Sequence, residues 1–178
     1  ASVPRFNDGT IIRYNILCDN GDHIIRTSGV LTNLMIYNNI FYSGNQFRDI
    51  RIISNGSWNG ASAKGSWYYN NVFYIMGENP TIDFGESLNN HFSNNSFFGT
   101  FLGDGLNDQF IVTEDPLFIN PIPGQDMSNL QGFMIQSTSP LIGKGYRIEG
   151  KPEVDFFKNP ILETNLVDIG AHQTFPNT

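Results

Sequence analysis

Three aspartates occupy positions at which stacked strands could bring them together for the chemistry of glycosidic bonds. Asp22, Asp49 and Asp83 each follow a strand-like segment of a repeated pattern. Glycoside hydrolysis uses two carboxylates, about 5–5.5 Å apart for retention or about 6.5–9.5 Å apart for inversion. Strands of one sheet lie about 4.8 Å apart, so carboxylates one or two strands away from each other approach these distances. We therefore expect the three aspartates to face one groove as catalytic residues, with turn formation as the alternative.

Basic side chains accompany these acids. Asp22 adjoins His23, which it would orient as a general acid or base, unless His23 only caps the turn. Aligning the strand-like segments on an isoleucine in each places Arg26 above Arg51 on an exposed face. Arginine matches carboxylates bidentately, so both are predicted to contact a uronate or another acidic sugar. In a lyase these cations would neutralise the uronate while His23 removes its α-proton. The alternative is a solvated charge ladder with local ion pairs.

Two tryptophans lie at an inserted loop. Trp58 and Trp67 belong to the stretch "SNGSWNGASAKGSW" at 54–67. Loops that project from a regular scaffold are where binding residues concentrate. Both tryptophans are therefore predicted to stack on sugar rings, and hydrophobic burial under the loop is the alternative.

The elements that must position these residues repeat along the chain. The phrase "LMIYNNIFYSG" at 34–44 returns as "WYYNNVFYIMG" at 67–77, and two weaker copies flank this pair. The copies align on four asparagines, namely Asn15, Asn39, Asn71 and Asn95. Successive copies are 24, 32 and 24 residues apart, and the inserted loop accounts for the longer interval. Such self-similarity indicates stacked structural repeats.

Each repeat holds two short strands without a helical pattern, in too few residues for a strand–helix–strand unit. This predicts an all-β parallel β-helix with about four regular coils. The four asparagines are expected to form an internal ladder at a bend. Either of two neighbouring columns would face the core: Ile16, Ile40 and Val72, or Leu17, Phe41 and Phe73. Residues 1–178 are predicted to be a single domain, with regular coils over 1–107 and distorted terminal coils plus a closing cap over 108–178.

Composition argues against several other classes of function. The chain of 178 residues has a formal net charge of −7, which disfavours nucleic-acid binding. No apolar run is long enough to span a membrane. The three histidines lack zinc spacing, so no metal site is predicted, although Asp19 and Asp22 leave weak Ca2+ binding open. No cofactor motif is present, and the single Cys18 cannot form an intrachain disulfide.

Four motifs in the C-terminal half occur in a recognisable order: "EDPLFINP" at 114–121, "STSPLIGKG" at 137–145, "DFFKNPI" at 155–161 and "VDIGAHQ" at 167–173. With the coils upstream, this series resembles bacterial right-handed parallel β-helix proteins, which include secreted glycoside hydrolases and polysaccharide lyases. The resemblance extends over nearly the whole chain. It implies a right-handed solenoid closed by the last motifs, with Asp155 and Asp168 as turn and cap residues. Lys158 stands where such proteins often have Gly, which indicates a different turn there.

The resemblance implies a secreted bacterial protein that acts on a polysaccharide or oligosaccharide outside the cell, in the periplasm or at the cell surface. Glycoside hydrolysis is the first expectation, and lyase cleavage is the second. The alternatives are a non-catalytic glycan-binding or structural β-helix, or the scaffold end of an enzyme whose catalytic coils lie N-terminal to this chain. Such enzymes usually have more coils than the four counted here. The chain is therefore expected to be part of a longer protein, with the missing N-terminal part of the same β-helix as a partner.

Overall fold

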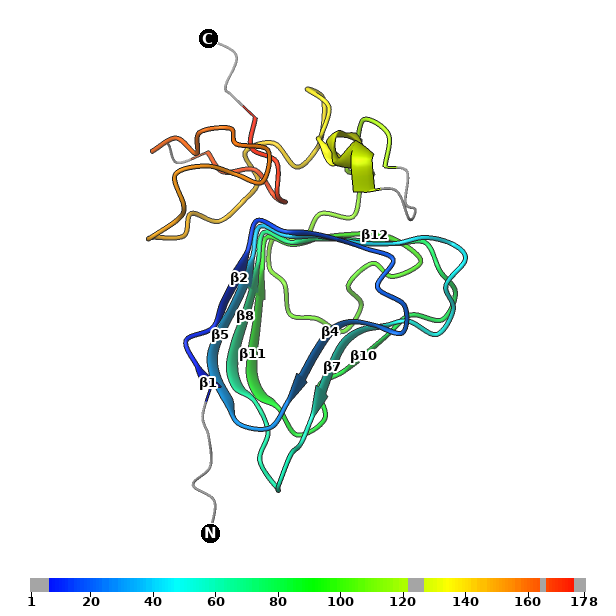
Figure 1. The fold of residues 1–178 in the computed structure, drawn as a ribbon, viewed down its shortest axis with the longest axis vertical. Coiled ribbons are helices and arrows are strands. Elements are labelled where there is room, and N and C mark those ends of the chain that lie inside the picture. Colours follow the sequence, from blue (N-terminus) through cyan, green and yellow to red (C-terminus); the bar gives the residue numbers. More distant parts are fainter. Residues whose placement is uncertain (1–6, 122–126, 164–165, 175–178) are drawn as a thin grey trace.

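The protein, described from a computed structural model over residues 7–121, 127–163 and 166–174, is an all-β solenoid (Figure 1). Its chain winds as a right-handed parallel β-helix of about four turns, and three parallel sheets form the walls. Sheet A contains β1 (Asn7–Asp8), β2 (Ile11–Arg13), β5 (Leu31–Tyr37), β8 (Lys64–Tyr69) and β11 (Leu88–Ser93). Sheet B contains β3 (Ile16–Cys18), β6 (Ile40–Ser43), β9 (Val72–Ile75) and β12 (Ser96–Gly99). Sheet C contains β4 (His23–Ser28), β7 (Arg51–Gly56) and β10 (Thr81–Asp83). The predicted fold class is confirmed.

Each coil turns from sheet A to sheet B at a residue with left-handed backbone. These corner residues are Tyr14, Asn38, Asn70 and Asn94, with φ between 51° and 56°. Asparagine enters this region at lower cost than most residues with a Cβ, because its short polar side chain bonds locally. The repeated Asn-Asn dipeptide therefore gives each later coil a corner residue followed by an asparagine of the ladder.

The second residue of each corner forms the predicted internal ladder. In each step the side-chain amide of one asparagine donates to Oδ1 of the next over 3.0 Å, in the order Asn15, Asn39, Asn71 and Asn95. The backbone N–H of each donor residue reaches the same oxygen. Asp108 ends the ladder, because its Oδ2 accepts from Asn95 Nδ2 over 2.8 Å. The ladder thus satisfies polar groups that are buried from water.

The column of sheet B that faces the interior is the aromatic one. Phe41, Phe73 and Phe97 lie in register, and successive ring centroids are 5.0 Å and 4.7 Å apart. Their side chains join the inward residues of the other two sheets in one hydrophobic core. The alternative column faces outward and consists of Ile16, Ile40 and Val72. It is buried as well, since it lies under the C-terminal segment.

The described residues after 112 lie beside the solenoid, against the outer face of sheet B (Figure 1). This segment includes the short 3-10 helix η1 (Met127–Phe133). Its apolar contacts with sheet B come from residues such as Phe118, Phe133, Leu141 and Ile169. Residues 108–112 continue the stack through single bridges to β11 and β12. The segment shields an apolar face of sheet B that would otherwise contact water. The division into regular coils over 1–107 and terminal coils with a cap over 108–178 stays a prediction.

The corner asparagines hold this C-terminal segment in place. Asn38 and Asn94 each donate a side-chain N–H to carbonyl groups of the segment over 2.7–3.0 Å. Asn70 bonds at both ends of its amide: Nδ2 donates to the Tyr146 carbonyl over 2.7 Å, and Oδ1 accepts from the Tyr146 N–H over 2.6 Å. One asparagine of each pair therefore builds the coil, and the other docks the segment.

The buried carboxylates of the last motifs accept hydrogen bonds from backbone N–H groups of the C-terminal segment. Asp155 is 3% exposed and accepts from the backbone N–H groups of Asn159 and Gln173. Asp168 likewise accepts from two backbone N–H groups. Lys158 lies in the same turn with φ of 69°, a conformation that Gly adopts more readily. These contacts agree with the predicted structural role of both aspartates.

His172 is a buried titratable side chain within this C-terminal segment. It is 7% exposed, and its Nδ1 accepts from the Ile135 N–H over 3.1 Å. Burial lowers its pKa from 6.5, although the nearby Asp155 and Asp168 carboxylates oppose this shift. The neutral ring is therefore favoured in the folded protein. Its contribution to stability is present in full above pH 6.5 and is lost as the pH falls through the lowered pKa.

We expect the free energy of unfolding to decline between pH 7.5 and pH 5.5 more steeply in the wild type than in His172→Asn. The asparagine Oδ1 can accept from the same N–H but does not titrate. Urea denaturation at both pH values measures the difference. Parallel declines in the two proteins would show that His172 does not carry this pH dependence.

Candidate functional site

The residues predicted to be catalytic lie in the strands of sheet C or just before them. The pairing register of these strands differs from the predicted one. β4 pairs with β7 so that His23 lies beside Arg51, and Arg26 lies beside Ser54. The predicted stacking of Arg26 on Arg51 is therefore wrong. The loops that precede the two strands differ in length, so alignment on an isoleucine displaced β7 from its true position.

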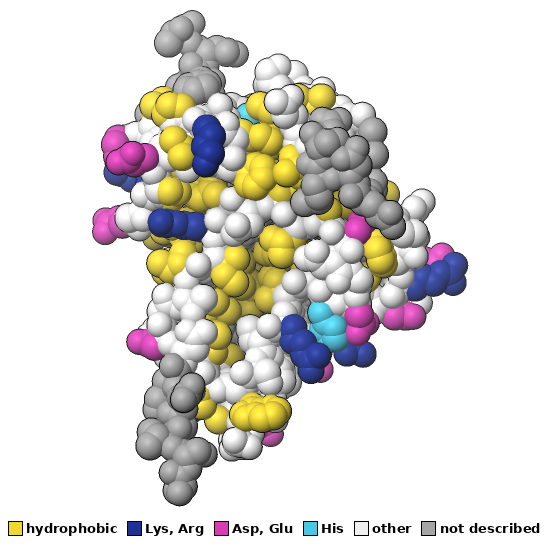
Figure 2. All heavy atoms as spheres, viewed as in Figure 1, with side chains coloured by type: hydrophobic (Ala, Val, Ile, Leu, Met, Phe, Trp, Pro, Cys, Tyr) yellow, Lys and Arg dark blue, Asp and Glu magenta, His cyan; other side chains and the backbone are white. Residues whose placement is uncertain are grey.

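Asp22, His23 and Arg51 form a polar cluster at the surface of sheet C. His23 Nδ1 lies 3.1 Å from Asp22 Oδ2, and His23 Nε2 lies 3.0 Å from Arg51 Nη1. Arginine can only donate, so Nε2 is the acceptor and Nδ1 carries the proton that faces the carboxylate. Both ring nitrogens are thus engaged. Figure 2 shows a histidine beside basic and acidic side chains at this edge of the molecule.

Asp49 and Asp83 lie at other positions of the repeat. Asp49 stands two residues before β7, and its Oδ1 accepts from Asn79 Nδ2 over 3.2 Å. Asp83 ends β10 and accepts from the Gly85 N–H over 2.8 Å. Asp22 instead directly precedes β4. The three carboxylates therefore do not form one column, and each has a local partner. Their catalytic role stays a prediction.

The two predicted aromatic residues lie on different parts of the coil. Trp58 is 68% exposed beside the hairpin turn of Asn59 and Gly60, whose φ angles of 51° and 73° suit a two-residue hairpin. Trp67 lies on β8 instead, with its side chain on the outer face of sheet A. Of the two, Trp67 lines a groove on this sheet.

An open groove of about 810 Å³ lies between the outer face of sheet A and the loop 146–149. Its floor consists of Asn33 and Met35 from β5 and of Trp67 and Tyr69 from β8. Its wall consists of Tyr146, Arg147, Ile148 and Glu149. The groove therefore combines aromatic rings with amide, guanidinium and carboxylate groups, a mixture typical of sites for small polar ligands.

Trp67 lines the groove and stacks on a neighbouring ring. The stacked face meets His91 of the next coil, with ring centroids 5.6 Å apart and an interplanar angle of 15°. Met35 lies beside Trp67 in the preceding coil and lines the groove. A flat ring placed over Met35 would therefore extend the stack on Trp67. Tyr69 and Tyr146 stand with centroids 5.5 Å apart where sheet A meets the loop.

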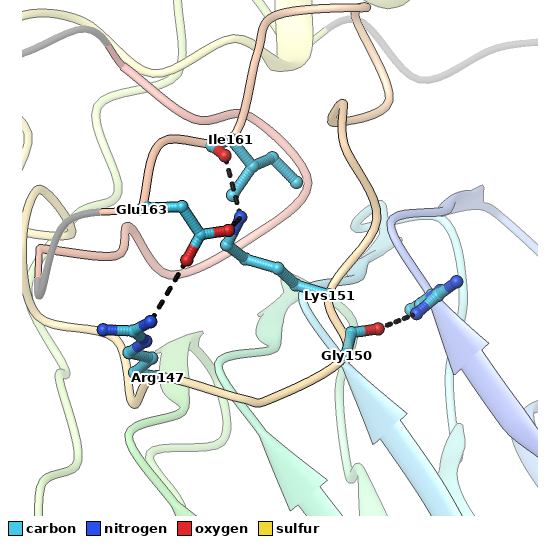
Figure 3. Close-up of polar contacts among 6 residues, drawn as sticks. Arg147, Gly150, Lys151, Ile161 and Glu163 are labelled. Atoms are coloured by element: carbon cyan, nitrogen blue, oxygen red, sulfur yellow. Dashed lines mark hydrogen bonds and ion pairs between the residues drawn. The ribbon is translucent and has the colours of Figure 1, made fainter.

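The wall of the groove is held by ion pairs and hydrogen bonds on both sides (Figure 3). Arg13 of β2 donates to the Gly150 carbonyl over 2.9 Å and so joins the loop to the first coil. Glu163 bridges Arg147 and Lys151 over 3.1 Å and 3.0 Å. Lys151 Nζ also donates to the Ile161 backbone carbonyl over 2.8 Å. The loop is therefore anchored before any ligand binds.

Three side chains near the groove, Glu163, Asp8 and Tyr69, have shifted pKa values that leave their charge at neutral pH unchanged. The Lys151 ammonium, by hydrogen bond and by charge, lowers the pKa of Glu163, so this ion pair weakens only as the pH falls below 4.5. Hydrogen bonds from Thr32 and Asn33 lower the pKa of Asp8 in the same way. Burial raises the pKa of Tyr69, which keeps its hydroxyl neutral. The groove thus presents neutral aromatic rings beside a charged rim.

Sequence reasoning identified Trp67 but missed the other lining residues. Two of them had a sequence signature, since Met35 precedes its ladder asparagine by the same number of residues as Trp67, and Tyr69 repeats the position of Tyr37. Tyr146 had none, because it belongs to the segment that packs beside the repeats. Its position is set by hydrogen bonds to Asn70, which lies 76 residues earlier in the chain.

The described parts of the chain show no group of three or more His, Cys, Asp or Glu side chains suited to a metal ion. Asp19, considered for Ca2+, accepts from the Gly44 N–H and from Gln46. Burial raises the pKa of Cys18 to about 11, so its thiol stays protonated. Within the described ranges no helix is long and apolar enough to cross a bilayer.

Comparisons with known proteins leave the family open. No protein-family model matches the chain, and no curated protein matches it. The β-helix part of the resemblance is confirmed by the fold itself. Its glycoside hydrolase and polysaccharide lyase part stays a prediction.

Proposed function

We propose that this protein binds a polysaccharide or oligosaccharide in the groove on sheet A. The observation that carries the proposal is that Trp67 lines the groove, stacked on His91 and beside Met35. A sugar ring has an apolar face of C–H groups and an edge of hydroxyl groups. The indole suits the first, and the polar groups of Asn33 and Arg147 suit the second.

The number of carboxylates lining this groove favours binding over cleavage. Among the residues lining the groove, Glu149 alone carries a carboxylate, whereas glycoside hydrolases use two. The proposal therefore takes up the non-catalytic alternative. Cleavage by Asp22, His23, Asp49 and Asp83, and a location outside the cell, stay predictions.

The test is titration of the protein with neutral and acidic oligosaccharides, monitored by calorimetry and by amide shifts in NMR spectra. We expect saturable shifts on β5, β8 and residues 146–149. Tyr146→Ala should weaken binding roughly tenfold, because it removes an aromatic ring from the wall while the backbone bonds to Asn70 remain. Assays for reducing ends and unsaturated uronates on the same samples would detect cleavage.

Phe110→Ala is the matched control. Phe110 is 56% exposed and Tyr146 is 53% exposed, but Phe110 does not line this groove. Its replacement should leave the affinity unchanged. Absence of binding across the whole panel, or equal losses in the two variants, would refute the proposal.

A further inference from the structure

The cations in the wall of the groove already hold a carboxylate (Figure 3). Arg147 lines the groove, and its Nη2 lies 3.1 Å from Glu163 Oε2. The other oxygen of the same carboxylate, Glu163 Oε1, lies 3.0 Å from Lys151 Nζ. Lys151 also donates to the Ile161 carbonyl, and its side chain is only 13% exposed. A carboxylate on a ligand would therefore have to compete with Glu163 for these two cations.

The other arginines offer no substitute at this place. Arg13 donates to the Tyr37 hydroxyl over 2.8 Å and to the Gly150 carbonyl over 2.9 Å. The two arginines predicted to contact an acidic sugar, Arg26 and Arg51, lie on β4 and β7 of sheet C. Among the described residues that line the groove, one is a cation, and it is the arginine paired with the carboxylate of the wall.

Two further carboxylates lie at the groove. Glu149 lines it, is exposed and has no ion-pair partner among the described residues. Asp8 Oδ1 accepts over 2.8 Å from Nδ2 of Asn33, which belongs to the floor. Hydrogen bonds from Thr32 and Asn33 lower the pKa of Asp8 from 3.8, so this group is ionised at neutral pH. Together with the net charge of −7, these carboxylates disfavour a negatively charged ligand.

Building on the proposed function, we propose that the groove selects neutral over acidic oligosaccharides, and that Glu163 sets this selectivity by holding the Arg147 guanidinium. Arginine matches a carboxylate bidentately, so without Glu163 this guanidinium would favour a uronate. With Glu163 in place, a uronate has to displace one carboxylate and approach Glu149, whereas a neutral sugar brings no charge. Glu163 does not line the groove, so it is a positioning residue that acts through Arg147.

The test compares each neutral oligosaccharide that binds with its C6-oxidised form, in which uronates replace hexoses at the same linkages. Calorimetry of the wild type should show about tenfold weaker binding of the acidic form. Added salt should narrow this difference, because it screens charges at a surface. Glu163→Gln removes the negative charge but keeps an oxygen that can accept from Arg147. It should strengthen binding of the acidic form about fivefold and change that of the neutral form by less than about twofold.

Glu78→Gln is the matched control. Glu78 pairs with Arg48 over 3.3 Å, and its side chain is exposed like that of Glu163. Neither residue of this pair lines the groove, so the variant breaks an exposed arginine pair, makes the same change in net charge and should leave both affinities unchanged. Glu149→Gln is an independent variant that removes the lining carboxylate. It should strengthen binding of the acidic form about threefold, and it tests the selectivity even if Glu163→Gln does not fold.

Binding of the acidic form as tight as that of the neutral form in the wild type would overturn the inference and leave the proposed function in place. The role of Glu163 would be overturned by equal effects of Glu163→Gln and Glu78→Gln. It would also be overturned if Glu163→Gln lost both ligands while circular dichroism showed an intact fold. Absence of binding of both forms would instead refute the proposed function, and the selectivity with it.

Discussion

Replacement of Asn71 by alanine is expected to lower the free energy of unfolding by roughly 4 kcal/mol. Asn71 is completely buried. Its Nδ2 donates to Asn95 Oδ1 over 3.0 Å and to the Ile36 carbonyl over 2.8 Å. Its Oδ1 accepts from the N–H and Nδ2 groups of Asn39 over 3.2 Å and 3.0 Å. Removing the amide takes away four hydrogen bonds. The Asn39 N–H and the Ile36 carbonyl lose these partners, at a cost of about 1–3 kcal/mol each, whereas Asn95 Oδ1 keeps the Asn71 N–H and Asn39 Nδ2 keeps two carbonyls.

The ladder supplies its own control. Asn15 holds the equivalent position in the ladder, but it is exposed and none of the described residues forms a rung before it. Asn15→Ala should therefore destabilise the protein far less than Asn71→Ala. Asn45→Ala, at an exposed loop position, should change stability by less than about 0.5 kcal/mol. Urea denaturation of the three variants gives the comparison, and equal losses for Asn15 and Asn71 would contradict the role of burial in the ladder.

Trp67→Ala is expected to weaken oligosaccharide binding about 10- to 100-fold, whereas Trp58→Ala should change it less than about twofold. This prediction depends on the proposed function. Trp67 lines the groove together with Met35, while Trp58 lies at a hairpin turn and does not line it. Calorimetric titration of both variants with the same ligand measures the difference.

His91→Ala separates stacking support from direct contact. It removes the imidazole ring that stacks on Trp67 but leaves Trp67 itself in the lining of the groove. We therefore expect a loss of only a few-fold. Thermal unfolding of each variant shows whether the sheet is intact. A loss confined to Trp58→Ala would place the ligand at the hairpin and refute the groove.

The register of sheet C could have been found in the sequence by a different alignment. Gly21, Asp49 and Asn79 have left-handed backbone two residues before β4, β7 and β10 begin. These residue types tolerate that conformation best. Aligning on them, rather than on the first isoleucine, pairs His23 with Arg51 as observed. These turn residues mark the register better because they lie directly before the strands, whereas apolar residues recur in several columns.

The sequence by itself determined the coil. Its period, its aromatic strands and its repeated asparagines appear in every repeat, so equivalent side chains stack and each contact is made several times. The asparagine ladder and the parallel sheets follow from this repetition, and both are confirmed.

Only the tertiary structure decided which column faces the core and where the groove lies. Both columns of sheet B are apolar, because the C-terminal segment buries the outer one, so hydrophobicity could not distinguish them. The groove wall depends on contacts such as Asn70 with Tyr146, which occur once and join distant residues. Repetition encodes a contact locally, whereas a single long-range contact arises only when the folded sheet presents a complementary surface.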